Sequence, residues 1–463
     1  MWNLSKIFVV FGFISLYSRH VIVGSPVMSV NQVSTRPYRN NTQNTPRIRS
    51  NSFQMLRDPW FHPKDGILAT ANTKVFAILK DNNTNLECHE INNAVHDIVA
   101  RSSHLFFAQT TSEVFSNRQR RNRYSRERRL RTRKMTPKYT KVVYPELAIA
   151  VSYEYFKKFK FDYWTIIPYL LSFWNAVDMR YRGLENPKYR FHISQFIFEA
   201  EPGNFKFLKE NGSPDYLTYD CVYNARNFWY EQKELIPLDS YDMIIIMTSS
   251  IICMKYDKVT NKCLPQIFGQ AWPSGACSVH HNIKQIDKLA IIHDNGAYEG
   301  VTTAAHEIGH LLGALDDGVS VYNSTTEEWG PPQCDLWDGY IMSGNKQASQ
   351  NAFEWSECSV KKFEKFIYSE SASCLYNKPK SVGRPIPRYL PGKLMNADEQ
   401  CKQAGAIESC EDKVSNCIML QCRFEDEGCI NTTAPAVEGT NCGLNTVGHI
   451  CIHGECVPEI NFI

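Results

Sequence analysis

Two histidines and a glutamate form the most chemically informative cluster in the sequence. His306 and His310 are four residues apart, so on an α-helix their imidazoles lie on one face, about one turn apart. Two imidazole nitrogens placed in this way can bind one Zn²⁺. Glu307 follows the first histidine, where its carboxylate can reach a water molecule on the metal rather than the metal itself. This spacing predicts a zinc centre with two ligands and a general base.

A third ligand is expected a few residues further along. Gly313 lets the helix end and the chain turn back, so a residue three positions later can bind the same metal. In the elongated pattern His-Glu-x-x-His-x-x-Gly-x-x-His, that residue is usually histidine. Here it is Asp316, whose carboxylate oxygen can also bind zinc.

The stretch from Ala290 to Gly318 resembles the catalytic centre of the reprolysin (adamalysin) branch of the metzincins. This branch includes snake-venom, ADAM, ADAMTS and tick salivary metalloproteases. The resemblance implies one catalytic Zn²⁺, with Glu307 as general base. It also implies that Met342 lies in a methionine turn under the metal, as a hydrophobic floor that fixes the ligands. Asp317 matches the acid after the third ligand, and we expect it to anchor the turn.

Asp316 is the one departure from the branch, which has histidine there, and it leaves two functional interpretations. An anionic ligand lowers the net charge at the metal and makes it a weaker Lewis acid. The first interpretation is a secreted zinc endopeptidase that cleaves extracellular proteins, such as matrix or clotting proteins, by the family's example. The second is a binding protein that kept the fold and is catalytically weak or inactive. The intact Glu307 favours the enzyme.

Length, charge and cysteine content limit the class of protein. A chain of 463 residues predicts two or three domains, and a net charge of +3 does not by itself indicate a partner. Sixteen cysteines indicate an oxidising compartment. Lys6 precedes an apolar run, 7–17, that fits a signal peptide over residues 1–24. We expect a secreted, soluble monomer without a membrane anchor or a nucleic-acid partner.

Residues 25–134 are predicted to be a propeptide. An apolar stretch at 74–79 indicates that part of it folds. The tetrads Arg118-Gln-Arg-Arg121 and Arg126-Glu-Arg-Arg129 resemble sites of a furin-like processing protease. The alternative is a patch that binds heparin or nucleic acid. The position of the tetrads directly before a folded domain favours processing, because clustered charge keeps a segment accessible.

Cys88 is the only cysteine of the predicted propeptide. Its thiolate could occupy the open zinc position and keep a zymogen latent, although its surroundings do not match the family's usual motif. It could also form a disulfide bond, with Cys221 as a candidate partner, or remain a free thiol. The sequence leaves all three alternatives open.

Residues 135–378 are predicted to form an α/β catalytic domain, because strand-like and helical segments alternate. The expected strands cover 145–151, 189–198, 241–248 and 289–292, and the expected helices cover 164–181 and 224–235. Pro168 is tolerable only in the first turn of its helix. The resemblance adds a mixed twisted sheet with a cleft between two subdomains. Residues 269–272 then form either the edge strand above the cleft, where substrate adds as a strand, or an ordinary loop.

The resemblance also implies structural features around this domain. A calcium site would use oxygen ligands from Glu146, Asp242, the Cys374 carbonyl and Asn377. The disulfide pairs implied are Cys253–Cys263, Cys277–Cys374 and Cys334–Cys358, which leaves Cys221 over.

The C-terminal part is predicted to be a linker, 379–389, followed by a disulfide-rich module, 390–463. Its eight cysteines replace a core that is too small, and they allow 105 pairings. Leu390-Pro-Gly, Ala397-Asp-Glu-Gln-Cys401 and Gly439-Thr-Asn-Cys442 resemble the disintegrin-like module of ADAMTS proteases. The module acts either as a structural buttress or as a substrate-positioning exosite. The overall layout looks most like the tick salivary proteases. Glycosylation sequons begin at Asn40, Asn82, Asn211, Asn323 and Asn431.

Overall fold

A computed structural model describes the chain from Leu68 to Glu459, with gaps, and all of the described residues lie within the compact unit Ser52–Ile463. The predicted signal peptide, both arginine-rich tetrads and the sequons at Asn40 and Asn82 lie outside the described residues. None of the helices in the described part is both long enough and apolar enough to cross a membrane. The described residues are 68–70, 72–80, 86–91, 95, 142–257, 259–260, 262–319, 322–323, 328–329, 334–344, 348–379, 385–410, 415–432, 434–443 and 448–459.

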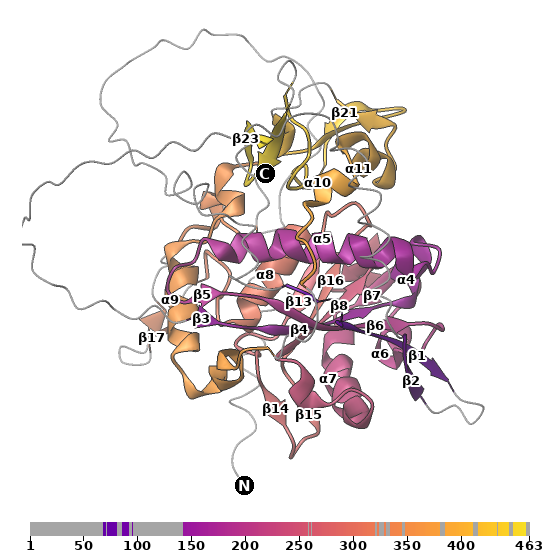
Figure 1. Ribbon diagram of the computed structural model, residues 1–463, viewed down its shortest axis with the longest axis vertical. Helices are drawn as coiled ribbons and strands as arrows, with labels where there is room; N and C mark the ends of the chain where they lie inside the picture. The colour runs from indigo at the N-terminus through magenta and orange to yellow at the C-terminus, as the bar shows by residue number, and fades with distance from the viewer. Residues whose placement is uncertain are drawn as a thin grey trace, which may run out of the picture. The chain divides into compact units, whose positions relative to one another are not determined.

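A mixed, seven-stranded sheet forms the centre of the region predicted to be the catalytic domain (Figure 1). Its five inner strands run parallel to one another, and the strand at each edge is antiparallel to its neighbour. The expected α/β class is therefore confirmed. In spatial order the strands are β13 (Gly269–Ala271), β16 (Leu289–His293), β8 (Met243–Thr248), β4 (Glu146–Val151), β6 (His192–Glu199), β1 (Lys74–Lys80) and β2 (Leu86–Glu90).

Both faces of the sheet are covered by helices, which explains why its inner strands are almost continuously apolar. On β4, Leu147, Ile149 and Val151 belong to one core cluster, whereas Ala148 and Ala150 belong to another. The first cluster lies under α4 (Tyr153–Lys158), α5 (Tyr163–Arg182), α8 (Val301–Leu311) and α9 (Glu357–Ile367). The second lies against α6 (Lys206–Glu210) and α7 (Cys221–Glu231).

Short strands and 3₁₀ turns complete the catalytic region. The small sheets are β3 (Val142–Val143) with β5 (Lys188–Tyr189), β7 (Tyr216–Thr218) with β9 (Ile251–Cys253) and β12 (Gln266–Ile267), β10 (Tyr256–Asp257) with β11 (Lys262–Cys263), β14 (Val279–His280) with β15 (Gln285–Ile286), and β17 (Tyr322–Asn323) with β18 (Glu328–Trp329). The 3₁₀ turns are η1 (Gln232–Glu234), η2 (Leu238–Ser240), η3 (Leu336–Asp338), η4 (Gln350–Phe353) and η5 (Glu370–Tyr376).

Helix α5 differs from its expected form at one point. The side chain of Asp162 caps its first turn by accepting the Trp164 N–H at 3.0 Å. Pro168 therefore lies in the second turn rather than the first. Since proline has no N–H, the helix forgoes one hydrogen bond to the Trp164 carbonyl.

The disulfide-rich module packs its elements around four disulfide bonds. The bonds join Cys401 to Cys422, Cys410 to Cys429, Cys417 to Cys451 and Cys442 to Cys456. The buried sulfur atoms themselves make up much of the small core. The elements are α10 (Pro391–Leu394), α11 (Ala397–Gln403), β19 (Glu408–Ser409), η6 (Ser415–Cys417), β20 (Gln421–Phe424), β21 (Gly428–Asn431), β22 (His449–Ile452) and β23 (Glu455–Pro458).

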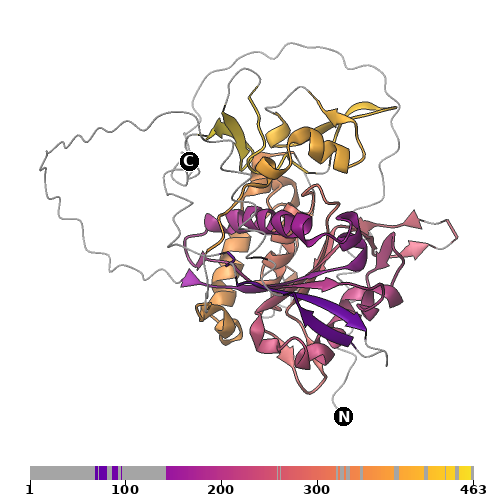
Figure 2. The ribbon, with the colours of Figure 1, turned by 45° about the vertical axis from the view of Figure 1, so that its right-hand side comes forward.

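Two buried ion pairs hold this module and the chain before it against α5, beside which the module lies in Figures 1 and 2. Arg180 pairs with Glu438 of the module, and both side chains are almost completely buried. Glu438 also accepts the His453 N–H at 2.9 Å. The contact between α5 and the module therefore includes a buried pair of opposite charges.

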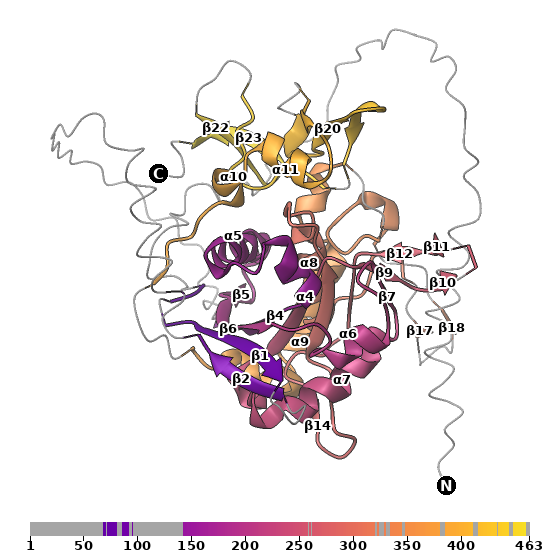
Figure 3. The same ribbon diagram turned by 90° about the vertical axis from the view of Figure 1, so that its right-hand side faces the viewer.

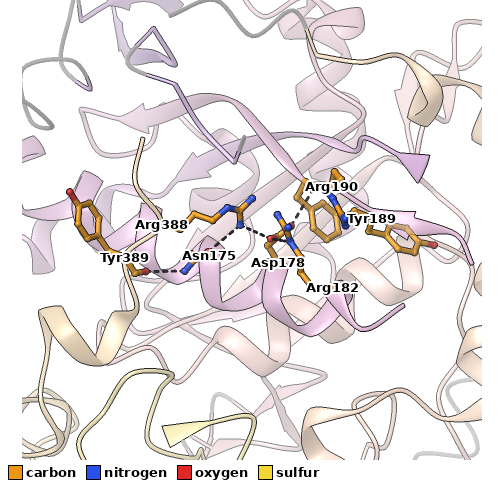
Figure 4. A network of polar contacts seen from close by, with 8 residues as sticks. Asn175, Asp178, Arg182, Tyr189, Arg190, Arg388 and Tyr389 are labelled. Carbon is orange, nitrogen blue, oxygen red and sulfur yellow. Dashed lines mark hydrogen bonds and ion pairs between the residues drawn. The ribbon is translucent and has the colours of Figure 1, made fainter. Parts of the chain in front are cut away.

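The second ion pair joins α5 to the described end of the predicted linker (Figure 4). Arg388 donates to the Asp178 carboxylate at 2.5 Å, and Arg182 donates to the same carboxylate at 2.7 Å. Asn175 donates to the Tyr389 carbonyl at 3.0 Å. Burial opposes ionisation of Asp178, but the two guanidinium groups outweigh it and hold the pKa of Asp178 below its ordinary value. The chain leading into the module is thus fixed to the helix.

Candidate active site

Helix α8 carries two of the three predicted zinc ligands, His306 and His310, and a buried carboxylate fixes its first turn. Asp294, at the end of β16, accepts the N–H of Gly300, the N-cap residue of α8, at 2.8 Å. The hydroxyls of Tyr155 and Tyr169 also donate to Asp294, at 2.5 and 2.7 Å. Asp294 is completely buried. Asp294 is not among the residues predicted from the sequence, although an acid directly after an apolar strand is an available clue.

The three predicted ligands converge on one point in the structure. Asp316 Oδ1 lies 3.1 Å from His306 Nε2 and 3.4 Å from His310 Nε2. The ligand atoms of all three residues lie within 4.8 Å of one another. Asp316 reaches this point because the chain turns back at Gly313. The φ of +99° at Gly313 gives the turn that the sequence predicts after α8. A Cβ at that position would also lie 2.8 Å from Phe366 Cβ.

Hydrogen bonds orient both imidazoles. His306 Nδ1 lies 2.8 Å from the Ile341 carbonyl, and His310 Nδ1 lies 3.0 Å from the Ala314 carbonyl. A carbonyl can only accept, so each Nδ1 carries the proton and each Nε2 lone pair is available to a metal. Two imidazole nitrogens and one carboxylate oxygen are a donor set that suits zinc. The residues present therefore fit the ion that the sequence predicts.

The charges of the cluster also favour a cation between the three side chains. Burial alone would lower the pKa of His310, but Asp316 and Glu307 raise it to about 9. Desolvation opposes ionisation of Asp316, yet His310 and the hydrogen bonds from both imidazoles hold its pKa well below the ordinary value. The same arrangement that attracts a proton here would attract a metal cation.

Glu307 lies beside the ligands and beneath the edge strand. Its side chain is buried, with 5% of the residue exposed. A Cβ on Gly269, the first residue of β13, would lie 2.7 Å from both Cγ and Oε1 of Glu307. Within the range 269–272, strand β13 therefore forms the predicted edge strand. It is the outermost strand at one side of the main sheet and lies directly against the predicted base.

Met342 and Asp317 support the site from below. Met342 is fully buried, and a Cβ on Gly309 would lie 2.7 Å from its Sδ, so this glycine lets the methionine pack against α8. The Asp317 N–H donates to the Met342 carbonyl at 2.9 Å. The Asp317 carboxylate accepts the Ser356 hydroxyl at 2.7 Å. Asp317 thus ties the turn after the third ligand to the Met342 turn and to the start of α9.

The structure brings three of the four predicted calcium ligands together. Asp242 Oδ2 accepts the Glu146 N–H at 2.9 Å, and Asn377 donates to the Glu146 carboxylate at 2.9 Å. Cys374 is joined to Cys277, whose N–H donates to the Asp242 carbonyl. Burial, together with the charge of Glu146, raises the pKa of Asp242 to about 7.

Cys88 does not lie near the three zinc ligands. It is on β2, at the edge of the sheet opposite to β13. Six strand spacings of about 4.8 Å place these two strands roughly 29 Å apart. Burial raises the pKa of its thiol to about 11, which disfavours the thiolate that a metal binds. This position does not favour the latency alternative, and Cys88 and Cys221 are not bonded to each other.

The other cysteines of the catalytic region are paired. Cys253–Cys263, Cys277–Cys374 and Cys334–Cys358 are the pairs that the resemblance implies. Two further clusters of His, Cys, Asp or Glu occur within the described residues, but both depend on cysteines that are disulfide-bonded and so offer no thiolate to a metal. The His306 cluster is therefore the strongest metal candidate in the described part of the chain.

Comparisons with known proteins match two parts of the chain. Residues 242–379 match the family model described as reprolysin (M12B) family zinc metalloprotease. Residues 391–457 match the model described as ADAMTS cysteine-rich domain 2.

Curated proteins similar to this chain carry related names. A Bombyx mori protein named "A disintegrin and metalloproteinase with thrombospondin motifs like" is 33% identical over 320 residues, which is 69% of this chain and 45% of that protein. Human "A disintegrin and metalloproteinase with thrombospondin motifs 18" is 29% identical, over 57% of this chain and 19% of its own length. Eulophus pennicornis "Venom metalloproteinase 3" is 29% identical, over 50% and 52%. The chain thus spans at most about half the length of these relatives.

Proposed function

We propose that this chain, which combines a reprolysin-type metalloprotease domain with an ADAMTS-like cysteine-rich module, is a zinc-dependent endopeptidase that cleaves extracellular proteins. One observation carries the proposal. Three oriented ligand groups converge beside Glu307, and a short edge strand lies directly above that carboxylate.

The metal ligands and Glu307 would have different roles in hydrolysis. His306, His310 and Asp316 would hold one zinc ion, which supplies Lewis acidity toward the scissile carbonyl and the attacking water. Glu307 would accept a proton from that water as the water oxygen bonds to the carbonyl carbon. It would then pass this proton to the leaving nitrogen as the C–N bond breaks. Each turnover therefore consumes one water and returns Glu307 to its ionised form.

The edge strand β13 would bind the substrate in an extended form. It is paired on one side with β16 and ends the main sheet of the described residues, so its outer backbone groups can pair with a substrate strand. Such pairing is largely independent of sequence. We propose matrix or clotting proteins as the substrate class, by analogy with the tick salivary proteases that the layout resembles.

Hydrolysis of gelatin and fibrinogen tests this function. The processed protein should cleave at least one of them, a zinc chelator should stop cleavage, and added zinc should restore it. If the protein binds one zinc per chain and cleaves neither substrate nor a mixed peptide library, the inactive binding protein becomes the better interpretation. Asp316 is the residue that motivates this second candidate.

Substitution of Asp316 by histidine is expected to tighten zinc binding by roughly tenfold, because zinc favours imidazole nitrogen over carboxylate oxygen. Competitive chelator titration of the two proteins measures the difference. Asp338→His, at an exposed residue of η3, controls for the added histidine. Equal zinc affinities of the wild type and the Asp316→His variant would refute the prediction.

Substitution of Gly269 by alanine is expected to lower kcat/KM by roughly 100-fold, since a displaced catalytic group can cost that much. The new Cβ would need the space of Glu307 Cγ and Oε1. Gly344→Ala is the matched control, because its nearest contact would be Leu336 Cδ1 at 3.8 Å. Steady-state kinetics of the Gly269→Ala and Gly344→Ala variants, with zinc content measured for each, test this expectation. A wild-type kcat/KM for Gly269→Ala would contradict this placement of the base.

We also propose a structural calcium ion at Glu146, Asp242, Asn377 and the Cys374 carbonyl. The folded pKa of Asp242, about 7, is above the unfolded value, so without a cation stability falls as pH rises from about 4 to about 7. Calcium would offset the charge that then appears. Added calcium should raise Tm by roughly 5 °C at pH 8 and by less at pH 5. The same effect in Asp242→Asn would exclude this site.

Secretion and processing complete the proposal. The protein would be secreted as a glycosylated monomer, with residues 1–24 removed as a signal peptide. A furin-like protease would cut after Arg121 or Arg129, ahead of the catalytic domain at 135–378. Seven disulfide bonds within the described residues support an oxidising environment. N-terminal sequencing and native mass measurement of the secreted protein, with and without a furin inhibitor, test these points; an intact 25–463 chain would contradict the processing.

A further inference from the structure

Two strands that precede the predicted processing sites belong to the catalytic sheet (Figure 3). Strand β1 runs parallel to β6 with five residue pairs in register, from Lys74 opposite Gln195 to Ile78 opposite Glu199. Strand β2 then folds back on β1 with five antiparallel pairs. The segment from Leu68 to Ile91, here called the pro-strand segment, therefore extends the sheet beyond β6.

Side chains of the pro-strand segment complete both hydrophobic cores. Ile78 is fully buried in the same cluster as Ala148 and Ile197 of the catalytic strands. Val75 and Leu68 are buried in the opposite cluster, below α5. Removal of the segment would expose apolar surface on both sides of β6, together with the backbone edge of that strand.

Backbone carbonyls of the segment are tied to three separate parts of the chain. The Ile78 carbonyl accepts a hydrogen bond from Asn204 Nδ2 at 2.8 Å, and Asn204 is completely buried. The Leu68 carbonyl accepts the Ile193 N–H at 2.7 Å. The Ala69 carbonyl accepts the Ile386 N–H at 3.1 Å. The segment thus joins the sheet to the stretch that carries Arg388 and leads into the module.

The pro-strand segment also lies away from the candidate active site. Strand β2 forms the edge of the sheet opposite to β13, where a substrate would bind. Occupation of the β6 edge therefore leaves the β13 edge open. A segment in this position has no need to leave before the enzyme can act.

We propose that the pro-strand segment stays in the catalytic domain as a non-covalently bound strand pair after the chain between it and β3 is cut. The partner of the β6 edge is thus residues 68–91 of the same chain, and the processed protein consists of two polypeptides. This inference rests on the proposed function only in assuming that a processing protease cuts the chain before β3. In an experiment, an inserted protease site can replace that natural cleavage.

The test uses the full chain with an affinity tag at each end of the mature sequence and a site-specific protease site between residues 96 and 141. Glu307→Gln can be included, since it prevents self-cleavage. After cutting, capture by the C-terminal tag should retain the N-terminal fragment at one per chain in native buffer, and release it only in denaturant. Loss of the fragment in native buffer, with the C-terminal fragment still folded, would overturn the proposal.

Two variants identify the contact responsible. Ile78→Ala removes buried side-chain atoms from the core and should increase the rate of fragment release at least about tenfold. Lys74→Ala is the matched control on the same strand, because the Lys74 side chain is exposed and makes surface contacts of little energy, an ion pair with Glu90 at 3.5 Å and a contact with the Phe76 ring. Equal release rates for both variants would show that the fragment is held elsewhere. If Ile78→Ala does not fold, retention of the wild-type fragment alone decides the proposal. Because retention rather than proteolysis is measured, an inactive protein does not affect the result.

Discussion

Replacing Glu307 by glutamine is expected to lower kcat/KM for peptide hydrolysis by about 10²- to 10⁴-fold, the contribution of a well-placed general base. Glutamine keeps the size of the side chain under Gly269 but cannot accept the proton of the attacking water. None of the three zinc ligands is changed. The loss should therefore fall on kcat, with zinc content and Tm close to those of the wild type.

The control for this variant is Glu234→Gln, which changes an exposed glutamate in η1. Steady-state kinetics on a peptide substrate, with zinc measured by metal analysis, separate catalysis from metal loss. A Glu307→Gln protein that retains a tenth or more of the wild-type kcat/KM would show that another group takes the proton. A variant that loses zinc would instead assign Glu307 to the structure of the site.

Replacing Asp178 by alanine should lower the free energy of unfolding by about 3–5 kcal/mol, the usual cost of leaving a buried charge without its partner. Asp178 is completely buried and accepts hydrogen bonds from Arg182 and Arg388, as Figure 4 shows. The variant leaves two guanidinium groups in a poorly hydrated place. A fall in Tm of roughly 10 °C follows for a domain of this size.

Arg388→Met gives the matched comparison. It removes one cation, keeps an apolar side chain of similar length, and leaves Asp178 paired with Arg182. We expect less than half of the loss seen in Asp178→Ala. Thermal and urea unfolding of both proteins measure the difference, and equal stability of Asp178→Ala and wild type would contradict the assignment.

The pH dependence of this pair has a definite sign. The folded pKa of Asp178 is below its ordinary value, so the ion pair stabilises the protein above the unfolded pKa near 4. That contribution disappears as pH falls through the lower folded pKa. The stability difference between wild type and Asp178→Ala should therefore be constant near neutral pH and shrink below about pH 4.

Local patterns in the sequence were sufficient for the centre of the site. The spacing of His306 and His310 already fixes their shared helix face, and Gly313 marks where that helix ends. The apolar runs also predicted four of the five inner strands, all but β1, because strands covered on both faces need little else to be recognised. These inferences depend on neighbours within a few residues.

Features that depend on distant partners could not be predicted in this way. Nothing within 74–80 specifies β6 as its parallel partner, more than a hundred residues away. Asp294 becomes informative only when Tyr155 and Tyr169 are seen around it. The position of Cys88 at the sheet edge opposite to β13 could not be predicted for the same reason, since its strand is placed by long-range pairing.

The two edges of the main sheet have different chemistry, and this difference bears on self-assembly. The outer strand β2 exposes Glu87, His89 and Glu90, and charged side chains discourage a further strand from joining. The other edge, β13, is three residues long and uncharged. Growth of sheets into fibrils requires that each molecule both offers and accepts an edge. This molecule can pair a substrate strand with β13, but the charged β2 edge disfavours pairing with a second molecule. Sheet growth from one molecule to the next is therefore disfavoured.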